Sequence, residues 1–447
     1  MAMMMMPNSE PAMQLENQLF ALPATLTDRW RTEHEKLNPT TIFTEDGTAG
    51  DINFYIPPST AGLLSLGDMV LELEVAIKVK KNNQNNFEII TAAEGVAPVN
   101  NFLHSIFQSV HVTVANRLIS DAATFYPYRA YFESLLFHSP EAQFSQLSSA
   151  GYALDLPGKM NNQTDNTGEV WRHDLFGKGE YVQLSGKIFA DLFDQSKPLC
   201  TGIPVQIRLV MNRPEFCLRV WDADKDTKTY KPFIRNARLS VRRYIPAPDF
   251  MTAVAGQLLN RTVKYHIERI VMRVADIPKN TQSTVVTNLQ IGQIPKVVFI
   301  GFLDSEDFHG NYQKNPFNFH HFDVRQISVE VDGQSYPTKP YNADFAKNQS
   351  LECYDGLLDA LGAKNHPTGC WSVNRNGYNE GYAIFGFDLT PGHTGRGPLT
   401  LIKQGNLSVS VTFAKSHAKS LMMVCMMVFD SIIEFNQHRQ LIADFST

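Results

Sequence analysis

Apolar and polar residues alternate along most of this chain, which is the pattern of strands with one buried face. In residues 69–79 (MVLELEVAIKV), apolar residues occupy every odd position, whereas Glu72, Glu74 and Lys78 occupy even positions. Many short strands separated by Gly, Pro and Asn predict a β-sandwich or a barrel. Similar alternation recurs in residues 110–114, 205–211, 237–241, 267–274, 327–331 and 407–413.

Two further segments predict elements of a different kind. Residues 421–429 (LMMVCMMVF) form the most apolar run, but it is about half as long as a helix that crosses a bilayer. We interpret this run as a strand buried on both faces, with its methionines in a core. Residues 126–137 (YPYRAYFESLLF) predict one helix inserted between strands, because Pro127 is tolerated in a first turn.

A weak internal repeat predicts that the chain contains the same β domain twice. Residues 110–117 (VHVTVANR) and 327–334 (ISVEVDGQ) are both alternating strands that run into a tight turn. Residues 188–194 (IFADLFD) and 384–390 (IFGFDLT) form a second pair, and each is followed by a loop and an alternating strand. Both pairs are separated by about half the chain length, as expected for a duplication.

The predicted domain organisation follows from this repeat. We expect an N-terminal arm over residues 1–40, a first sandwich over residues 41–246 and a second over residues 247–447, with the boundary near Pro246 and Pro248. A chain of 447 residues agrees with two domains. The long irregular stretches 138–180 and 340–379 are predicted to be protruding or clasping loops on a rigid scaffold.

Charge and cysteine content restrict the classes of partner and the compartment. The formal net charge is −5, so the chain as a whole provides no field that would hold a phosphate backbone. The five cysteines are odd in number, scattered and never spaced as Cys-x-x-Cys, which predicts reduced thiols. The start of the chain lacks a secretory signal, so we expect the protein to be made and assembled inside a cell and not secreted.

The motifs that carry chemistry are absent from the sequence or weak. It contains no phosphate-binding loop, no H-E-x-x-H, no G-x-S-x-G and no EF-hand loop. The glycine-rich residues 392–397 (GHTGRG) predict a surface loop, and residues 222–226 (DADKD) predict a solvated loop rather than a calcium site. Four glycosylation sequons, which begin at Asn162, Asn260, Asn348 and Asn406, are interpreted as chance matches.

One cluster of histidines and carboxylates could offer ligands to a metal ion. Adjacent histidines on a strand point to opposite faces, so the neighbouring pair in this cluster could not both bind one ion. We therefore predict polar packing there, and no catalytic, cofactor-binding or metal-binding residue anywhere in the chain. The cluster consists of His309, His320, His321, Asp304, Glu306 and Asp307.

Several segments of the second half resemble the hexon-like major capsid proteins of Polinton/Maverick elements and adintoviruses. The resemblance begins at residues 282–304 (QSTVVTNLQIGQIPKVVFIGFLD) and continues at 315–319 (NPFNF). In the first half, residues 126–137 look like their counterpart in that family. The Met-rich start departs from the family, so the resemblance says nothing about the arm. Further similar segments follow in the same order at residues 331–335, 381–391, 401–407 and 428–439.

The resemblance implies an all-β double jelly roll, in which two tandem eight-stranded sandwiches carry a few short inserted helices. It also implies a structural protein that trimerises into pseudo-hexameric capsomers and builds an icosahedral shell around a double-stranded DNA genome. The implied partners are further copies of the chain and a penton or minor capsid protein, with packaged DNA only an indirect partner and no membrane span. The implied location is the virion capsid, and no catalytic residue is implied.

Two other classes of protein remain open at this point. The first is a carbohydrate-binding or adhesin-like jelly-roll module, which would be expected to be secreted. The second is a jelly-roll metalloenzyme, which would need a clustered set of His and Glu ligands inside one barrel. Neither a secretion signal nor such a ligand set is found in the sequence.

Overall fold

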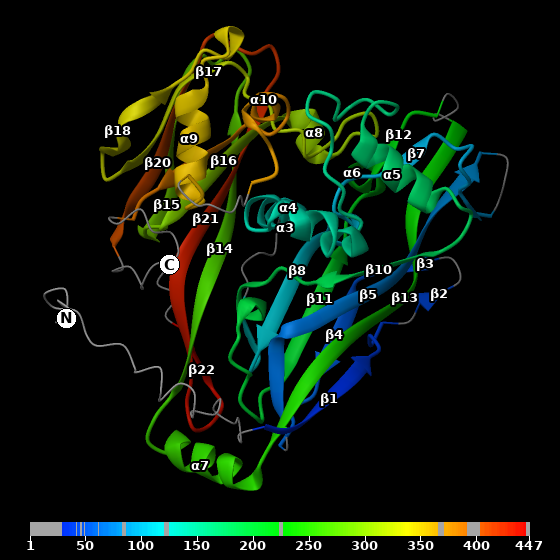
Figure 1. Cartoon of the computed structure of the whole chain (residues 1–447), viewed down its shortest axis with the longest axis vertical. Helices are drawn as coiled ribbons and strands as arrows, with labels where there is room; N and C mark the ends of the chain where they lie inside the picture. The colour runs from blue at the N-terminus through cyan, green and yellow to red at the C-terminus, as the bar shows by residue number, and fades with distance from the viewer. Residues whose placement is uncertain are drawn as a thin grey trace, which may run out of the picture.

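Antiparallel strands make up most of the chain in the computed structural model, as the alternating pattern predicts. The structure describes residues 29–443 except 42, 45–46, 49, 61, 83–85, 120–124, 223–226, 365–370 and 391–402. The described strands form two sandwiches of two four-stranded sheets each, with short extra strands at their edges. Figure 1 shows the two sandwiches side by side.

The first sandwich contains eight main strands. One sheet has the order β1 (Arg29–Leu37), β13 (Lys228–Pro246), β5 (Leu63–Lys81) and β10 (Val182–Lys187). The other has the order β4 (Ile52–Ile56), β11 (Val205–Met211), β8 (Phe107–Val114) and β9 (Arg117–Leu118). The short strands β6 (Glu88–Ile89), β7 (Val96–Pro98) and β12 (Leu218–Val220) lie in its connections.

The second sandwich repeats this arrangement strand for strand. One sheet has the order β14 (Val263–Ile277), β21 (Leu421–Phe435), β16 (Val297–Asp304) and β19 (Ile384–Asp388). The other has the order β15 (Ser283–Gln293), β20 (Gln404–Phe413), β17 (Val324–Val331) and β18 (Gln334–Asn342). Both sandwiches therefore pair their strands, counted along the chain, as 1-8-3-6 and 2-7-4-5. This is the jelly-roll order.

The internal repeat is correct for one of its two predicted pairs and for part of the other. β8 with β9 and β17 with β18 are the fourth and fifth strands of the two rolls. In the second pair, residues 384–390 contain β19, but residues 188–194 follow β10 and include a 3₁₀ turn, η2 (Asp191–Asp194). Those two segments therefore hold different positions in their rolls, but the alternating strands that follow them, β11 and β20, are both seventh strands, as the repeat predicts.

The predicted arm boundary at residue 40 requires a correction. β1 lies inside the range assigned to the arm, and it pairs with β13 from Arg29 opposite Pro246 to Leu37 opposite Leu239. The segment RWRTEHEKL shows little apolar alternation because β1 is an edge strand, and its residues 31–36 are exposed. At the other side of the boundary, α7 (Pro248–Leu258) follows β13 and leads into β14.

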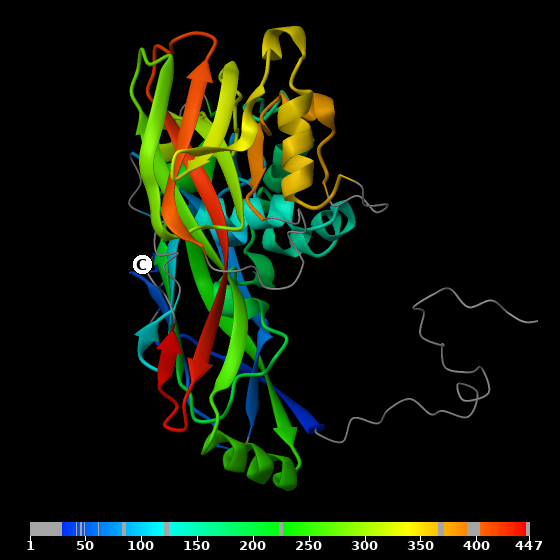
Figure 2. The same ribbon diagram turned by 90° about the vertical axis from the view of Figure 1, so that its left-hand side faces the viewer.

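Helices are more numerous than the sequence pattern predicts. The predicted helix is present as α3 (Tyr126–Leu136). The stretch 138–180 is not irregular, because it contains α4 (Pro140–Phe144) and α5 (Thr167–Phe176), and the stretch 340–379 contains α9 (Leu351–Ala360) and α10 (Arg375–Tyr378). In both rolls these helices lie between the fifth and sixth strands, and the helices of both insertions project from the same side of the sheets (Figure 2). Three short helices lie in other connections, namely α2 (Phe102–Ser105), α6 (Pro214–Cys217) and α8 (Ser305–His309).

The hydrophobic core explains why the Met-rich strand is apolar on both faces. Met423, Met426 and Met427 of β21 are fully buried in the second core cluster, as predicted for a core strand. Tyr131 and Phe132 of α3, which belong to the first roll by sequence, are buried in the same cluster. The helix inserted from the first roll therefore covers a sheet of the second roll (Figure 1).

Candidate functional site: the contact between the two jelly rolls

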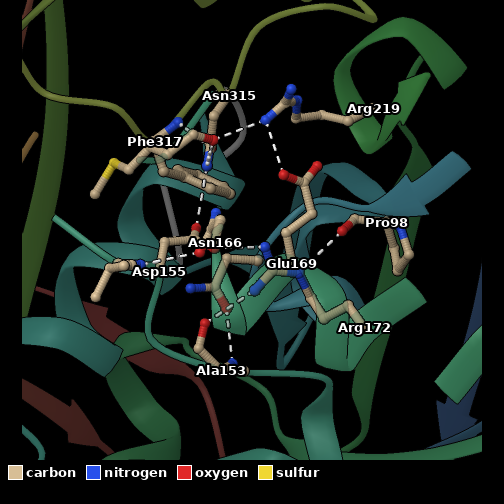
Figure 3. A network of polar contacts seen from close by, with 12 residues as sticks. Pro98, Ala153, Asp155, Asn166, Glu169, Arg172, Arg219, Asn315 and Phe317 are labelled. Carbon is tan, nitrogen blue, oxygen red and sulfur yellow. Dashed lines mark hydrogen bonds and ion pairs between the residues drawn. The ribbon is translucent and has the colours of Figure 1, made fainter. Parts of the chain in front are cut away.

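A buried arginine organises the loops at the contact between the rolls (Figure 3). Arg172 of α5 is 1% exposed, and its Nη2 lies 2.7 Å from Oδ1 of Asp155, which is fully buried. Arg172 also donates from Nε to the Pro98 carbonyl at 3.0 Å and from Nη1 to the Ala153 carbonyl at 2.9 Å. One guanidinium thus joins β7, the segment at residues 153–155 and α5 into a single unit.

The same carboxylate carries the network into the second roll. Asn315, which follows α8, donates from Nδ2 to Oδ2 of Asp155 at 3.0 Å. Tyr382, which precedes β19, donates its hydroxyl hydrogen to the Asp155 carbonyl at 2.6 Å. Asn166 donates from Nδ2 to the other carboxylate oxygen at 2.9 Å. Both carboxylate oxygens are therefore paired, as a charge buried between two domains requires.

A second buried ion pair supports the same loops. Arg219 of β12 donates from Nη1 to Oε2 of Glu169 at 3.0 Å and to the Met160 carbonyl at 2.7 Å. Burial raises the pKa of Glu169 to about 7, although Arg219 opposes the shift. Burial likewise lowers the pKa of the Arg219 guanidinium. Desolvation therefore offsets much of the attraction within this pair.

A third buried cluster joins α3, η2 and β14. Arg129 is fully buried, and it contacts Glu133 at 2.6 Å and Asp191 at 2.7 Å. The Ile270 amide of β14 donates to Oδ1 of Asp191 at 3.2 Å, which ties the cluster to the second roll. Burial raises the pKa of Glu133 to about 7, with Arg129 acting in the opposite direction.

This pKa predicts that the protein loses stability as the pH rises towards neutrality. Between the ordinary pKa of 4.5 and about 7, folded Glu133 holds a proton that the unfolded chain has released. Its contribution to the free energy of unfolding therefore falls with increasing pH, by at most about 1.4 kcal/mol per pH unit. Urea unfolding at several pH values should show that the free energy of unfolding falls less steeply with pH for Glu133→Gln than for the wild type. Glu141→Gln, at an exposed position of α4, should keep the wild-type dependence on pH. The same pH dependence in all three proteins would contradict the raised pKa of Glu133.

Stacked aromatic rings form the apolar part of the contact. Tyr131 of α3 stacks on Phe317 of the second roll with ring centroids 4.3 Å apart, and Tyr128 stacks on Phe308 at 5.2 Å. Phe319 of the second roll packs against Phe132 of α3 with ring centroids 5.0 Å apart, and Gly301 of β16 leaves room for the Phe319 ring, with which a Cβ would collide. Offset and edge-on aromatic pairs add stability beyond their buried area.

A cavity of about 660 Å³ lies beside this contact, with walls from both rolls. Its lining includes Glu133 and Lys187 from the first roll and Ile270 and Lys296 from the second. Both lysines are paired, Lys187 with Asp194 at 2.5 Å and Lys296 with Asp430 at 3.1 Å. The charged groups of the cavity therefore also hold the surrounding elements in place.

These features together form a joint between the two rolls. The ionisable groups at the contact bind backbone carbonyls and one another, and the rings close the space between the rolls. Such an arrangement fixes the relative orientation of the rolls, because a buried charge that loses its partner is strongly destabilising.

The predicted histidine and carboxylate cluster does not converge in the structure. His320 and His321 lie in a loop and not on a strand, and the ring of His321 stacks on Phe345 with centroids 4.1 Å apart. Glu306 pairs with Lys419 at 3.0 Å, whereas the carboxylate of Asp307 is buried and its pKa is raised to about 6 by burial. Within the described part of the chain, no group of three or more His, Cys, Asp or Glu side chains could hold a metal ion.

Other predicted features fall partly or wholly outside the described residues. The glycine-rich residues 392–397, residues 223–226 of the acidic cluster and Cys370 belong to this group. Asp222 is described, and it pairs with Lys228 at 2.6 Å. No described helix has the length and apolar character that crossing a membrane requires. The described cysteines are buried free thiols, namely Cys200, Cys217, Cys353 and Cys425.

Sequence reasoning did not find the residues of the joint. Asp155, Asn166 and Arg172 lie in a polar stretch that looks solvated. Their partners outside this stretch, Pro98 and Asn315, are distant in sequence. One available signal was the spacing of Glu169 and Arg172, which places both on one face of a helix. Nothing in the sequence indicated that this face is buried.

The fold that these strands define is the double jelly roll. Its structural relatives include viral major capsid proteins. No family model matches the chain.

Several solved structures are similar to this chain over nearly its whole length. A chain of the Sputnik virophage structure superposes with a TM-score of 0.66 at 13% identity, covering 100% of this chain and 96% of that one. The mavirus major capsid protein gives 0.56 at 12% identity, with 98% and 96% covered, and the Faustovirus major capsid protein gives 0.57 at 9% identity, with 95% and 94% covered. In sequence, the uncharacterized protein F54H12.2 of Caenorhabditis elegans is 25% identical over 354 residues, which is 78% of this chain and 82% of that protein.

Proposed function

We propose that this chain is a major capsid protein of the Polinton/Maverick and adintovirus type, with no enzymatic activity of its own. The observation that carries the proposal is the repetition of one jelly-roll topology in two rolls that a buried joint holds together. The similarity to viral major capsid proteins over almost the full length of the chain supports it.

In this proposal the chain has a segment that precedes β1, a first jelly roll up to residue 246 and a second from residue 247. Three copies place six similar sandwiches around one axis and so form a pseudo-hexameric capsomer. Capsomers then build an icosahedral shell around double-stranded DNA, with a penton or minor capsid protein as a further partner. Assembly takes place inside the host cell, and the protein resides in the virion.

The helical insertions between the fifth and sixth strands are the proposed contacts between copies. Phe144 of α4 is 89% exposed and Leu351 of α9 is 47% exposed, so both insertions present apolar side chains to solvent. Burial of such side chains against a neighbouring copy would favour association.

The proposal predicts a stable trimer in solution. Light scattering of the purified full chain should give about three times the mass of the 50.3 kDa monomer. Negative-stain microscopy of the same sample should show particles with hexagonal outlines. A protein that stays monomeric at high concentration without such particles would contradict the proposal and favour a jelly-roll binding module.

A further inference from the structure

A tight turn before β17 contains two adjacent residues in the left-handed backbone conformation. Residues 320–323 (HHFD) lead from Phe319 into β17, and Phe322 and Asp323 have φ values of 45° and 51°. Aspartate tolerates this conformation, but a bulky residue such as phenylalanine rarely adopts it. The turn is therefore strained, and specific contacts must hold it closed. We call residues 320–323 the histidine turn.

The ring of His321 makes a hydrogen bond that is possible only when the ring is neutral. The Asp323 amide donates to Nδ1 of His321 at 2.9 Å. Because a backbone N–H can only donate, Nδ1 carries no proton, and the proton of the neutral ring is on Nε2. This acceptor nitrogen is one of the contacts that close the strained turn.

The carboxylate of Asp323 competes for the same nitrogen. Its Oδ1 lies 3.5 Å from Nδ1 of His321, and its side chain is 45% exposed. The carboxylate can pair with Nδ1 only when this nitrogen carries a proton, whereas the amide can bind it only when the proton is absent. One nitrogen thus has two alternative partners on one residue, and protonation exchanges the first for the second.

The histidine turn also fastens residues 414–420, which connect β20 to β21. The Asp323 carbonyl accepts a hydrogen bond from the Ala414 amide at 2.8 Å. The ring of His417 packs edge-on against Phe322 and Phe413, with centroids 5.5 and 4.8 Å apart. A change of backbone conformation at Phe322 and Asp323 would therefore disturb both contacts and loosen the connection.

Burial and nearby charges set the protonation of the histidines at this end of the second roll. Burial lowers the pKa of His321, with Asp323 opposing the shift and His320 adding to it. Burial also lowers the pKa of His320 and of His417, and Asp304 opposes the shift in both. The rings are therefore neutral at neutral pH.

Other charged groups lie on the elements around the turn. Lys314 adds to the lowering of the pKa of His320. Phe345, on which His321 stacks, begins the 3₁₀ turn η4 (Phe345–Lys347). The remaining groups are paired with one another, namely Glu306 with Lys419 at 3.0 Å, and Asp344 with Arg325 at 3.0 Å and Lys347 at 3.3 Å.

We propose that the histidine turn is an acid-sensitive switch, in which protonation of His321 at Nδ1 opens the turn and releases the connection between β20 and β21. At neutral pH the ring binds the Asp323 amide, and the turn stays closed. In acid a proton from solvent occupies Nδ1, the ring moves towards the Asp323 carboxylate, and Phe322 and Asp323 leave the left-handed region. Histidine suits this role because its charge changes close to neutral pH. The inference goes beyond the proposed capsid function and does not depend on it.

The direction of the pH dependence follows from the lowered pKa of His321. Below its ordinary pKa of 6.5, the unfolded chain binds a proton that the folded ring takes up only at lower pH. The contribution of His321 to stability is therefore complete above pH 6.5 and is lost as the pH falls. Glu133 changes the free energy of unfolding in the opposite direction, so the test must measure the turn itself.

Hydrogen exchange of the full chain, followed by mass spectrometry at about pH 7.5 and about pH 5, measures the turn on both sides of the histidine titration. Rates are corrected for the intrinsic effect of pH on exchange. In the wild type, peptides that contain the amides of Asp323 and Ala414 should lose about fivefold to tenfold protection in acid, as expected for the loss of a hydrogen bond. His321→Asn places an amide oxygen near the position of Nδ1 and does not titrate, so its protection should be the same at both pH values.

Two further variants make the test specific. His321→Phe keeps a ring against Phe345 but removes the acceptor, so protection should be low at both pH values. His34→Asn, at an exposed position of β1, should respond to acid as the wild type does.

Three results would overturn the switch: equal protection of the wild type at both pH values, an acid response in His321→Asn as large as that of the wild type, or wild-type protection of His321→Phe at neutral pH. If His321→Phe does not fold, as judged by circular dichroism, the comparison of His321→Asn with the wild type still decides.

Discussion

Replacing Asp155 by alanine is expected to lower the free energy of unfolding by about 3–5 kcal/mol. The substitution leaves the buried guanidinium of Arg172 without its counter-ion, and the amides of Asn166 and Asn315 lose their acceptor. An uncompensated buried charge has a cost of this size. Urea unfolding followed by circular dichroism would measure the change.

Asp165 provides the matched control for this experiment. It lies in the same connection, its side chain is 52% exposed and it pairs with Lys159 at 3.4 Å. An exposed pair of this kind contributes about 1 kcal/mol or less, so Asp165→Ala should be nearly neutral. If both variants unfolded at the same urea concentration, Asp155 would not be holding the joint together.

Replacing Phe317 by alanine is expected to cost about 3–5 kcal/mol, because it opens a cavity between the rolls. Phe317 is fully buried, and its ring contacts Tyr131, Tyr128 and Phe216 of the first roll at centroid distances of 4.3, 5.8 and 6.0 Å. The substitution therefore removes packing from the contact between the rolls as well as from the core of the second roll. Thermal unfolding should show a lower and broader transition as the rolls unfold less cooperatively.

Leu259→Ala tests whether burial, and not the loss of an apolar side chain alone, causes this effect. Leu259, which follows α7, is 70% exposed, so its truncation should change stability by less than about 0.5 kcal/mol. A destabilisation equal to that of Phe317→Ala would mean that the aromatic contact between the rolls is not what stabilises the chain.

Both predictions concern the part of the molecule that matters most for the proposed capsid function. A building block can present fixed surfaces to its neighbours only if its two rolls do not rotate against each other. The Asp155 network, the Arg129 cluster and the stacked rings all cross the contact between the rolls, so they supply this rigidity together.

Alternation of apolar and polar residues was sufficient to predict many of the long strands, but not all strands of the two rolls. The segments around residues 69–79, 205–211 and 407–413 became β5, β11 and β20, because each buries one face in its own sandwich. The edge strand β1 was missed, since a strand whose side chains face water needs no apolar alternation. Most short helices were also missed, since α5 and α9 are ten residues each and depend on tertiary packing.

The sequence by itself determined that the chain is a duplicated β protein. A two-residue alternation and an internal repeat can both be recognised without knowing which residues are in contact. Only the tertiary structure decided what joins the two rolls. Asp155 and Asn315 are 160 residues apart, and nothing in either segment marks them as buried partners. Lys78 and Lys231 likewise become a like-charge pair only through the register of β5 and β13. The charge density on a surface depends on which strands the fold places side by side.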